Sequence, residues 1–196
     1  MHPRWKTQDE FPGSISIPFG IKTSHTWHEV GQILRIINDL DVETFVEIGA
    51  HVGGLGSIVS CVEKYKPFKY IGIEINREVI DERMVRYINQ TDAMKHETAE
   101  WLSKKMSGKT MFYCDGGNKI AEMFLYRKCL KSGDIIACHD YFDGQEVFGL
   151  HGFGRDKGEC GCVPEVFAAD LKLLNETMKS LPKYLLMGTR IMGYEN

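Results

Sequence analysis

The sequence lacks several features that would place it in broad classes of protein. None of its apolar runs approaches the ~20 residues that cross a membrane, and residues 1–6 have no apolar core of the kind a signal peptide needs. Its lysines and arginines form no basic run with interleaved aromatic residues, and the formal net charge is −3. These absences argue against a nucleic-acid-binding surface. We therefore expect a cytoplasmic protein that binds neither nucleic acid nor membrane.

Cysteine pairs suited to a structural metal site are also missing. The six cysteines are Cys61, Cys114, Cys129, Cys138, Cys160 and Cys162. Four of them fall in predicted strands or helices, where a free cysteine behaves as a small apolar residue. Without a signal peptide we expect all six to be reduced. Cys160 and Cys162 have His151 nearby, but their C-x-C spacing lacks a second cysteine pair, so we do not favour zinc there.

The length of 196 residues and the 43% hydrophobic content suit one α/β domain with a sizeable core. Residues 1–25 contain prolines and glycines with little periodicity, and we expect an arm or cap there. Residues 26–196 are predicted to form the single domain. Its predicted helices lie at 26–40, 57–65, 77–89, 99–106, 120–131 and 163–181. We also expect a short edge strand at 92–98 and a terminal hairpin within 184–194.

A glycine-rich turn follows the first predicted strand of this domain. Residues 44–48 form a short apolar run typical of a buried parallel strand, and the pattern Glu-x-Gly-x-x-x-Gly-Gly begins inside it with Glu47, Gly49, Gly53 and Gly54. Such a turn brings bare backbone N–H groups close to a ligand. The pattern is not the G-x-G-x-x-G of a dinucleotide site, and its acid would repel a pyrophosphate. It suits a ligand with an ammonium or sulfonium group. The alternative is a turn that binds nothing.

Acidic residues recur where the predicted parallel strands end. The strands at 44–48, 69–74, 110–115 and 134–140 carry at these ends the acids Glu47, Glu74, Asp115 and Asp140. In an open parallel sheet these ends line the ligand crevice. Glu74 can accept both ribose hydroxyls of an adenosine, a device that nicotinamide enzymes share. The sequence therefore predicts a nucleoside-binding crevice at this edge of the sheet.

A stretch rich in glycine and aromatic residues follows the last of these strands. It covers 141–162, and we expect no secondary structure of its own within it. A loop of this length in a compact domain is usually a lid or a binding loop. We therefore predict a lid over the crevice.

The order of these parts resembles the class I S-adenosylmethionine-dependent methyltransferases from about residue 26 to the end. The glycine-rich pattern resembles their motif I, and residues 113–118 resemble a segment of the small O-methyltransferases. Residues 137–141, with 161–166 beyond the loop, resemble the cephalosporin-hydroxylase and macrocin-O-methyltransferase type. This resemblance implies a Rossmann-like, doubly wound, mostly parallel seven-stranded sheet with a C-terminal antiparallel hairpin.

The resemblance also implies roles for individual residues. The methionine part of S-adenosylmethionine would be held by Glu47, Gly49, Ala50, Gly53 and Gly54. Glu74 would hold the ribose, Thr98 would flank the adenine, and Asp115 and Asp140 would face the reacting methyl group. In the catechol and caffeoyl-coenzyme A relatives, the matching aspartates bind magnesium. Here Tyr141 stands where those relatives have an asparagine, and Asn118 replaces a histidine, so the Mg²⁺ site at Asp115 and Asp140 is incomplete.

By this resemblance the chain is an enzyme that methylates an oxygen of a small hydroxylated molecule. His139 or Asp140 would act as general base, or a metal at Asp115 and Asp140 would lower the pKa of the acceptor hydroxyl. Asp140 has a plainer alternative, hydrogen bonds to loop N–H groups. A non-catalytic cofactor-binding or partner-binding domain would keep the fold, and a nicotinamide oxidoreductase would share Glu74. The sequence does not identify the methyl acceptor, and it leaves a homodimer as one possible oligomeric state.

Overall fold

The computed structural model describes residues 15–16, 20–23, 25, 27–117, 119–139, 184–186 and 189–193. The predicted lid at 141–162 and the predicted helix at 163–181 lie outside the described residues. So do Asn118, Asp140, Tyr141, His151, Cys160 and Cys162. Of the other cysteines, Cys61 and Cys129 are free thiols.

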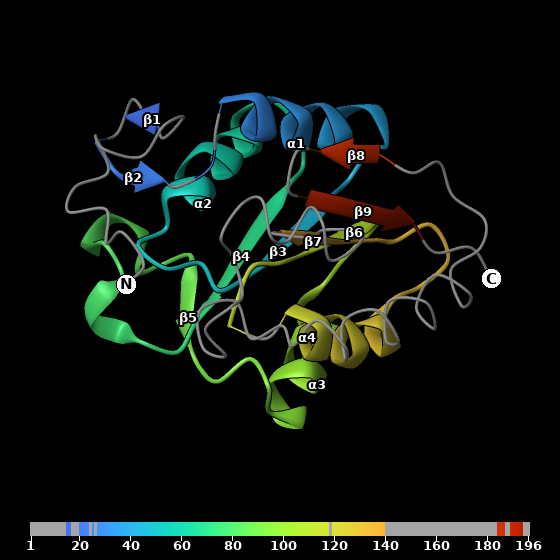
Figure 1. The fold of residues 1–196 in the computed structure, drawn as a ribbon. Helices are drawn as coiled ribbons and strands as arrows, with labels where there is room; N and C mark the ends of the chain where they lie inside the picture. The colour runs from blue at the N-terminus through green and yellow to red at the C-terminus, as the bar shows by residue number, and fades with distance from the viewer. Residues whose placement is uncertain are drawn as a thin grey trace, which may run out of the picture.

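Five parallel strands carry the fold (Figure 1). They are β3 (Thr44–Ile48), β4 (Lys69–Glu74), β5 (Ile88–Gln90), β6 (Thr110–Cys114) and β7 (Ile135–His139). Their order across the sheet is β5-β4-β3-β6-β7, with the first strand of the domain in the centre. Every residue of β3 and β6 is buried, because both faces of the sheet are covered. The predicted α/β, doubly wound parallel sheet is confirmed.

Two further strands lie beyond β7. β9 (Thr189–Gly193) pairs antiparallel with β7, and β8 (Tyr184–Leu186) pairs antiparallel with β9. The residues between β7 and β8, and those that join β8 to β9, lie outside the described part of the chain. The complete seven-stranded sheet with a C-terminal hairpin therefore stays a prediction.

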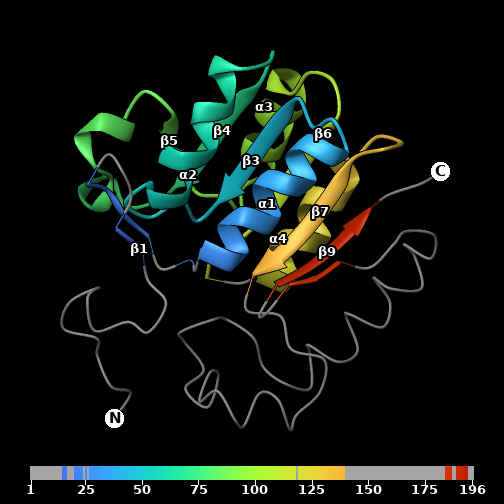
Figure 2. The same cartoon turned by 90° about the horizontal axis from the view of Figure 1, so that it is seen from above.

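Helices cover both faces of the sheet (Figures 1 and 2). The sheet therefore separates two clusters of buried apolar residues, one on each face. On one face lie α1 (Trp27–Asp39) and α2 (Gly54–Val59), the latter continued by a 3₁₀ turn at Ser60–Lys64. On the other lie α3 (His96–Lys105) and α4 (Lys119–Tyr126), the latter followed by a 3₁₀ turn at Arg127–Cys129. Side chains alternate between the faces: Phe45 packs on the α1 side, and Val46 and Ile48 pack on the α3 side.

The segment between β4 and α3 corrects two predictions. The predicted helix at 77–89 is wrong: the chain forms 3₁₀ turns at Arg77–Val79 and Glu82–Met84 and then β5. Each turn is capped by the residue before it, because Asn76 and Asp81 accept hydrogen bonds from backbone N–H groups two residues on. Such local bonds compete with helix formation. Ile80, Met84 and Ile88 are all buried. Their spacing is that of a helix face, but they are buried from 3₁₀ turns and a strand.

The predicted edge strand at 92–98 is also wrong. β5 is the strand at this edge of the sheet, and α3 already begins at His96. Backbone and side-chain bonds around Asp92 close the intervening turn: the Lys95 N–H donates to its carbonyl at 3.3 Å and the Met94 N–H to its carboxylate at 2.9 Å.

Among the described residues, no helix combines the length and apolar composition that a membrane span requires.

The N-terminal segment packs against the glycine-rich turn. β1 (Ile15–Ser16) and β2 (Lys22–Thr23) form a two-stranded antiparallel pair, and Ile21 is buried in the core on the α1 side. A Cβ at Gly54 would lie 2.1 Å from the carbonyl oxygen of Lys22. The glycine therefore permits the segment before α1 to reach the carboxyl edge of the sheet.

Gly49 lies in close contact with the backbone that follows β6. Its φ is +82°, and its N–H donates to the carbonyl of Ile73 at 2.9 Å. A Cβ there would lie 2.6 Å from the carbonyl oxygen of Asp115 and from the Cα of Gly116. These neighbours are backbone atoms, which cannot move aside as a flexible side chain does.

We expect Gly49→Ala to lower the free energy of unfolding by about 2–4 kcal/mol, the sum of a left-handed backbone penalty and overpacking. Gly117→Ala is the matched control, because no atom lies within 4 Å of a Cβ there. The control should change stability by less than about 0.5 kcal/mol. Urea denaturation of both variants measures the difference, and equal losses would contradict this account of Gly49.

Candidate functional site

The ends of four parallel strands bring the candidate residues to one edge of the sheet. Ile48 pairs with Ile73 on one side and with Cys114 on the other, and Cys114 pairs with Cys138. The residues that follow these positions, Gly49, Glu74, Asp115 and His139, are therefore at the same level. Asp140 follows next and is not among the described residues.

Glu74 is held by the backbone of two turns. Its Oε2 accepts a hydrogen bond from the N–H of His51 at 2.8 Å, and its Oε1 accepts one from the N–H of Asn76 at 2.9 Å. Each carboxylate oxygen keeps further acceptor capacity, so both can still receive a hydroxyl. The next residue, Ile75, leaves 64% of its surface exposed, an apolar face beside a polar one. This combination suits a nucleoside, which has a sugar and a flat base.

The close contacts that the turn glycines permit are with the protein itself. A Cβ at Gly53, whose φ is +90°, would meet the side chain of Met84 at 2.7 Å, and Gly54 faces Lys22 as described above. Ala50 is buried, and its N–H donates to the carbonyl of Ile73. The turn is therefore held in place by contacts with Met84, Lys22 and Ile73.

Glu47 is buried at the end of β3. It is 2% exposed, and the hydroxyl of Tyr70 donates to its Oε2. Burial raises the pKa of Glu47 to about 8; the nearby carboxylates of Asp115 and Glu74 add to this effect, while Tyr70 and His139 oppose it. At neutral pH this carboxyl is largely protonated. The predicted contact of Glu47 with a cationic ligand stays a prediction, and a bound cation would oppose this rise in its pKa.

Two histidines and two carboxylates form a chain beside this turn. Asp115 Oδ1 lies 2.9 Å from His139 Nδ1, and Glu29 Oε1 lies 3.1 Å from His139 Nε2. The second Asp115 oxygen, Oδ2, lies 3.3 Å from Nε2 of His25. The two imidazole rings are tilted against each other with centroids 4.7 Å apart. We call these four residues the His–acid cluster.

The His–acid cluster can hold and transfer protons. Both ring nitrogens of His139 face carboxylate oxygens, so either the imidazole is doubly protonated or one carboxyl carries the proton. All four side chains are at most 14% exposed. In such an environment charge–charge interactions are stronger than in water. Acid–base chemistry at this edge of the sheet is the natural use of such an arrangement.

Sequence reasoning missed His25 and Glu29. His25 falls in the predicted arm at 1–25, and Glu29 falls in the predicted helix at 26–40, where neither position indicates a site. One signal for Glu29 was available: it shares the apolar face of α1 with Ile33 and Ile36, at spacings of four and seven, and all three are buried. His25 lies in an irregular segment and carried no such signal.

Thr98 lies at the wall of a cavity beside the tip of β5. Its hydroxyl donates to the carbonyl of Asp92 at 2.8 Å and lies 3.1 Å from the hydroxyl of Thr91. The cavity has a volume of about 740 Å³, and Thr91, Thr98 and Trp101 contribute to its lining. The Thr91 N–H donates to the carbonyl of Glu74, which connects this cavity to the strand-end acid.

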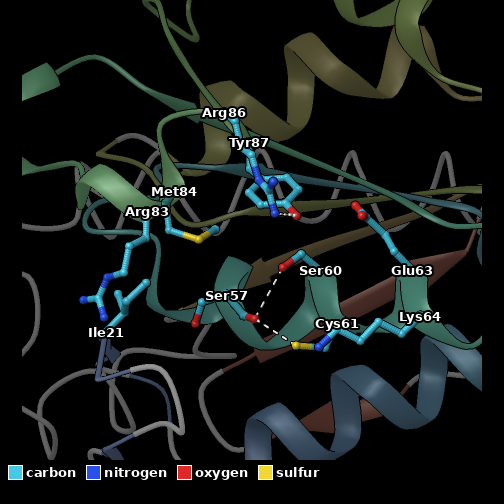
Figure 3. Close-up of a pocket in the computed structure, with 10 residues that line it drawn as sticks. All are labelled: Ile21, Ser57, Ser60, Cys61, Glu63, Lys64, Arg83, Met84, Arg86 and Tyr87. Carbon is cyan, nitrogen blue, oxygen red and sulfur yellow. Dashed lines mark hydrogen bonds between the residues drawn. The ribbon is translucent and has the colours of Figure 1, made fainter.

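A second cavity lies elsewhere, between α2 with its 3₁₀ turn and the segment at 82–87 (Figure 3). Its volume is about 460 Å³, and Ser57, Cys61, Arg83 and Tyr87 are among its lining residues. Of the predicted site residues that the structure describes, none lines it. The predicted site and this cavity are thus separate.

The pKa of Glu47 has a consequence for stability that depends on pH. Because the value of about 8 lies above the ordinary 4.5, the folded protein keeps a proton that the unfolded chain releases between these two values. The stabilising contribution is full below the lower value and is lost as pH rises through the upper one. We expect wild-type stability to fall relative to Glu47→Gln by up to about 1.4 kcal/mol per pH unit across this window.

Urea denaturation of both proteins between about pH 5 and pH 8 measures this difference. Glu63→Gln, which changes an exposed glutamate on the neighbouring 3₁₀ turn, is the control and should show the wild-type pH slope. Parallel slopes for wild type and Glu47→Gln would mean that Glu47 is ionised when folded.

No protein-family model matches the sequence, and no curated protein is significantly similar to it in sequence. Solved structures do match the fold. The apo structure of CmcI has a TM-score of 0.64 at 17% identity, over 86% of this chain and 68% of that one. The SAH-bound methyltransferase PaMTH1 of Podospora anserina has a TM-score of 0.58 at 13% identity, over 86% and 78%.

A third likeness is to MycE, a methyltransferase of the mycinamycin biosynthetic pathway, in complex with Mg and SAH. Its TM-score is 0.53 at 16% identity, over 84% of this chain and 49% of that one. Identities this low establish the fold alone. The described sheet and helices have the α/β, Rossmann-like fold of the class I S-adenosylmethionine-dependent methyltransferases.

Proposed function

We propose that this chain is an S-adenosylmethionine-dependent methyltransferase that methylates an oxygen of a small hydroxylated molecule. One observation carries the proposal: on a methyltransferase fold, an acid anchored at the tip of β4 shares a sheet edge with the partly buried Asp115–His139 pair. The matched structures support it, since CmcI has been solved with SAM bound, and PaMTH1 and MycE with SAH bound.

The residues at the strand ends fit this cofactor. Glu74 would accept the ribose hydroxyls, and the exposed face of Ile75 would contact the nucleoside. The adenine would lie toward the cavity at Thr98. The methionine part would follow the turn from Gly49 to Gly54, where a cationic group near Glu47 would lower the raised pKa of that carboxyl.

The His–acid cluster would take the proton of the acceptor. S-adenosylmethionine, when bound, supplies an electrophilic methyl group, so the protein mainly has to align the acceptor and remove its proton. Asp115 and His139 are already hydrogen-bonded, and Glu29 on the far nitrogen of His139 stabilises the protonated ring. Asp140 follows His139 directly, and we propose it as an alternative base.

The remaining sequence expectations extend this proposal to the whole chain. Residues 26–196 would form one domain with a seven-stranded sheet, in which β8 and β9 are the terminal hairpin. The 141–162 stretch would be the lid. The acceptor would be a small molecule, and the protein would act in the cytoplasm. A non-catalytic cofactor-binding domain is the main alternative, and turnover separates it from an enzyme.

S-adenosylhomocysteine should stabilise the protein, because a ligand that binds only the folded state shifts the unfolding equilibrium. At about 100 times its Kd we expect ~2.7 kcal/mol, or a rise in Tm of about 5–10 °C. Glu74→Ala should weaken binding by about 1.5–3 kcal/mol, and the exposed Glu78→Ala should not. Thermal shift and calorimetry measure both. A shift with NAD and none with S-adenosylhomocysteine would overturn the cofactor assignment.

Turnover should depend on Asp115. In a screen of phenols, sugars and carboxylic acids, we expect at least one acceptor to release S-adenosylhomocysteine. With that acceptor, Asp115→Asn should lower kcat by about 10²–10⁴-fold, the worth of a general acid–base group. Asp39→Asn, at the exposed end of α1, is the matched control. Cofactor binding without release from any acceptor would favour the non-catalytic alternative, and normal turnover of Asp115→Asn would remove Asp115 from the mechanism.

A further inference from the structure

We propose that His25, His139 and Asp115 form a binding site for a divalent transition-metal ion of the Zn²⁺ or Co²⁺ type. Each residue offers one ligand atom, and these atoms all lie within 4.8 Å of one another. They come from three separate parts of the chain: the segment before α1, the end of β7 and the end of β6. Binding of the ion does not depend on the proposed methyl transfer.

His25 is the strongest evidence for this site. Its side chain is 5% exposed, and its Nε2 is buried without a hydrogen-bond partner, because the 3.3 Å approach to Asp115 Oδ2 lacks hydrogen-bond geometry. Unpaired buried polar atoms destabilise a fold and are rare. A metal ion beside Nε2 would satisfy the atom. The ring is aimed at the carboxylate that would be its fellow ligand.

Thr23 orients the His25 ring for this role. Its Oγ1 lies 2.9 Å from His25 Nδ1 and accepts a hydrogen bond from the His25 N–H at 3.2 Å. A hydroxyl oxygen can accept two hydrogen bonds, so Nδ1 can carry its proton toward Thr23. The Nε2 lone pair is then available. Metal-binding histidines typically donate their other N–H in this way.

His139 has the matching arrangement at its opposite nitrogen. Its Nε2 faces Oε1 of Glu29 at 3.1 Å, and Glu29 is 4% exposed. A buried carboxylate on the far nitrogen fixes the tautomer and raises the basicity of the ligating one. Nδ1 lies 2.9 Å from Asp115 Oδ1. Tetrahedral ligands at the usual zinc bond lengths are roughly 3.3 Å apart, so small adjustments would admit the ion.

The three described ligands favour a transition metal, while the magnesium site predicted at Asp115 and Asp140 stays a prediction. Magnesium prefers an octahedron of oxygen ligands, whereas these residues supply two imidazoles and one carboxylate. Imidazole favours zinc, copper, iron and nickel. Asp140, the second magnesium ligand predicted from sequence, lies outside the described residues. Three protein ligands leave a fourth position for water or, under the proposed function, for the acceptor oxygen.

Cobalt provides a direct test, because Co²⁺ replaces Zn²⁺ and a tetrahedral site colours it. The full-length protein, freed of metal with a chelator, is titrated with Co²⁺ without cofactor or acceptor. We expect visible absorption bands that saturate at one ion per chain, that Zn²⁺ abolishes and that excess Mg²⁺ leaves unchanged. His25→Gln should remove them, and His96→Gln, on the exposed side of α3, should not. Glu29→Gln should weaken binding by about 10–100-fold.

A measurement on the wild-type protein makes the test independent of variant folding. Long-range ¹H–¹⁵N NMR of the histidine rings should show that Zn²⁺ binds Nε2 of one imidazole and Nδ1 of another. The proposal fails if no bands form, if Mg²⁺ displaces Co²⁺, or if folded His25→Gln binds like wild type. It also fails if sulfur-to-cobalt charge-transfer bands place the ion on cysteine. S-adenosylhomocysteine binding is measured separately, so its failure would not be confused with loss of this site.

Discussion

The parallel pairing of β3 with both its neighbours is the constraint on which the rest of the structure depends. Because β4 and β6 run in the same direction as β3 and in matching register, their ends reach one edge of the sheet. Gly49 permits the last step, since its backbone lies against Asp115 and Gly116 where a Cβ would not fit. Every candidate function of the chain uses the edge that this packing creates.

Several acids at one edge of the sheet would repel one another if all were ionised, and two features of the structure reduce this repulsion. Glu47 is buried beneath Tyr70 and stays largely protonated at neutral pH, so it adds little charge. Asp115 and Glu29 are ionisable neighbours that share His139 between them. Imidazoles thus balance the carboxylates, and the same balance would make the cluster suitable for proton transfer or, with a metal ion, for coordination.

Local signals predicted much of the framework but failed between β4 and α3, where both the helix at 77–89 and the edge strand at 92–98 were wrong. Continuous apolar runs identified β3, β4, β6 and β7, because strands covered on both faces have no polar side. The same reasoning failed at 77–89, where Ile80, Met84 and Ile88 are buried at helical spacing without a helix. There Asn76 and Asp81 bind nearby backbone N–H groups, and these short-range bonds favour 3₁₀ turns over a continuous helix.

The sequence by itself determined the parallel α/β framework, the glycine-rich turn and the strand-end positions of Glu74 and Asp115. Those features follow from apolar periodicity and from the backbone demands of glycine, both of which are local. Only the tertiary structure decided that His25 and Glu29 join Asp115 and His139, residues up to 114 positions apart in a chain of 196. Their meeting depends on how the segment before α1 packs against Gly54, a long-range contact that no local pattern encodes.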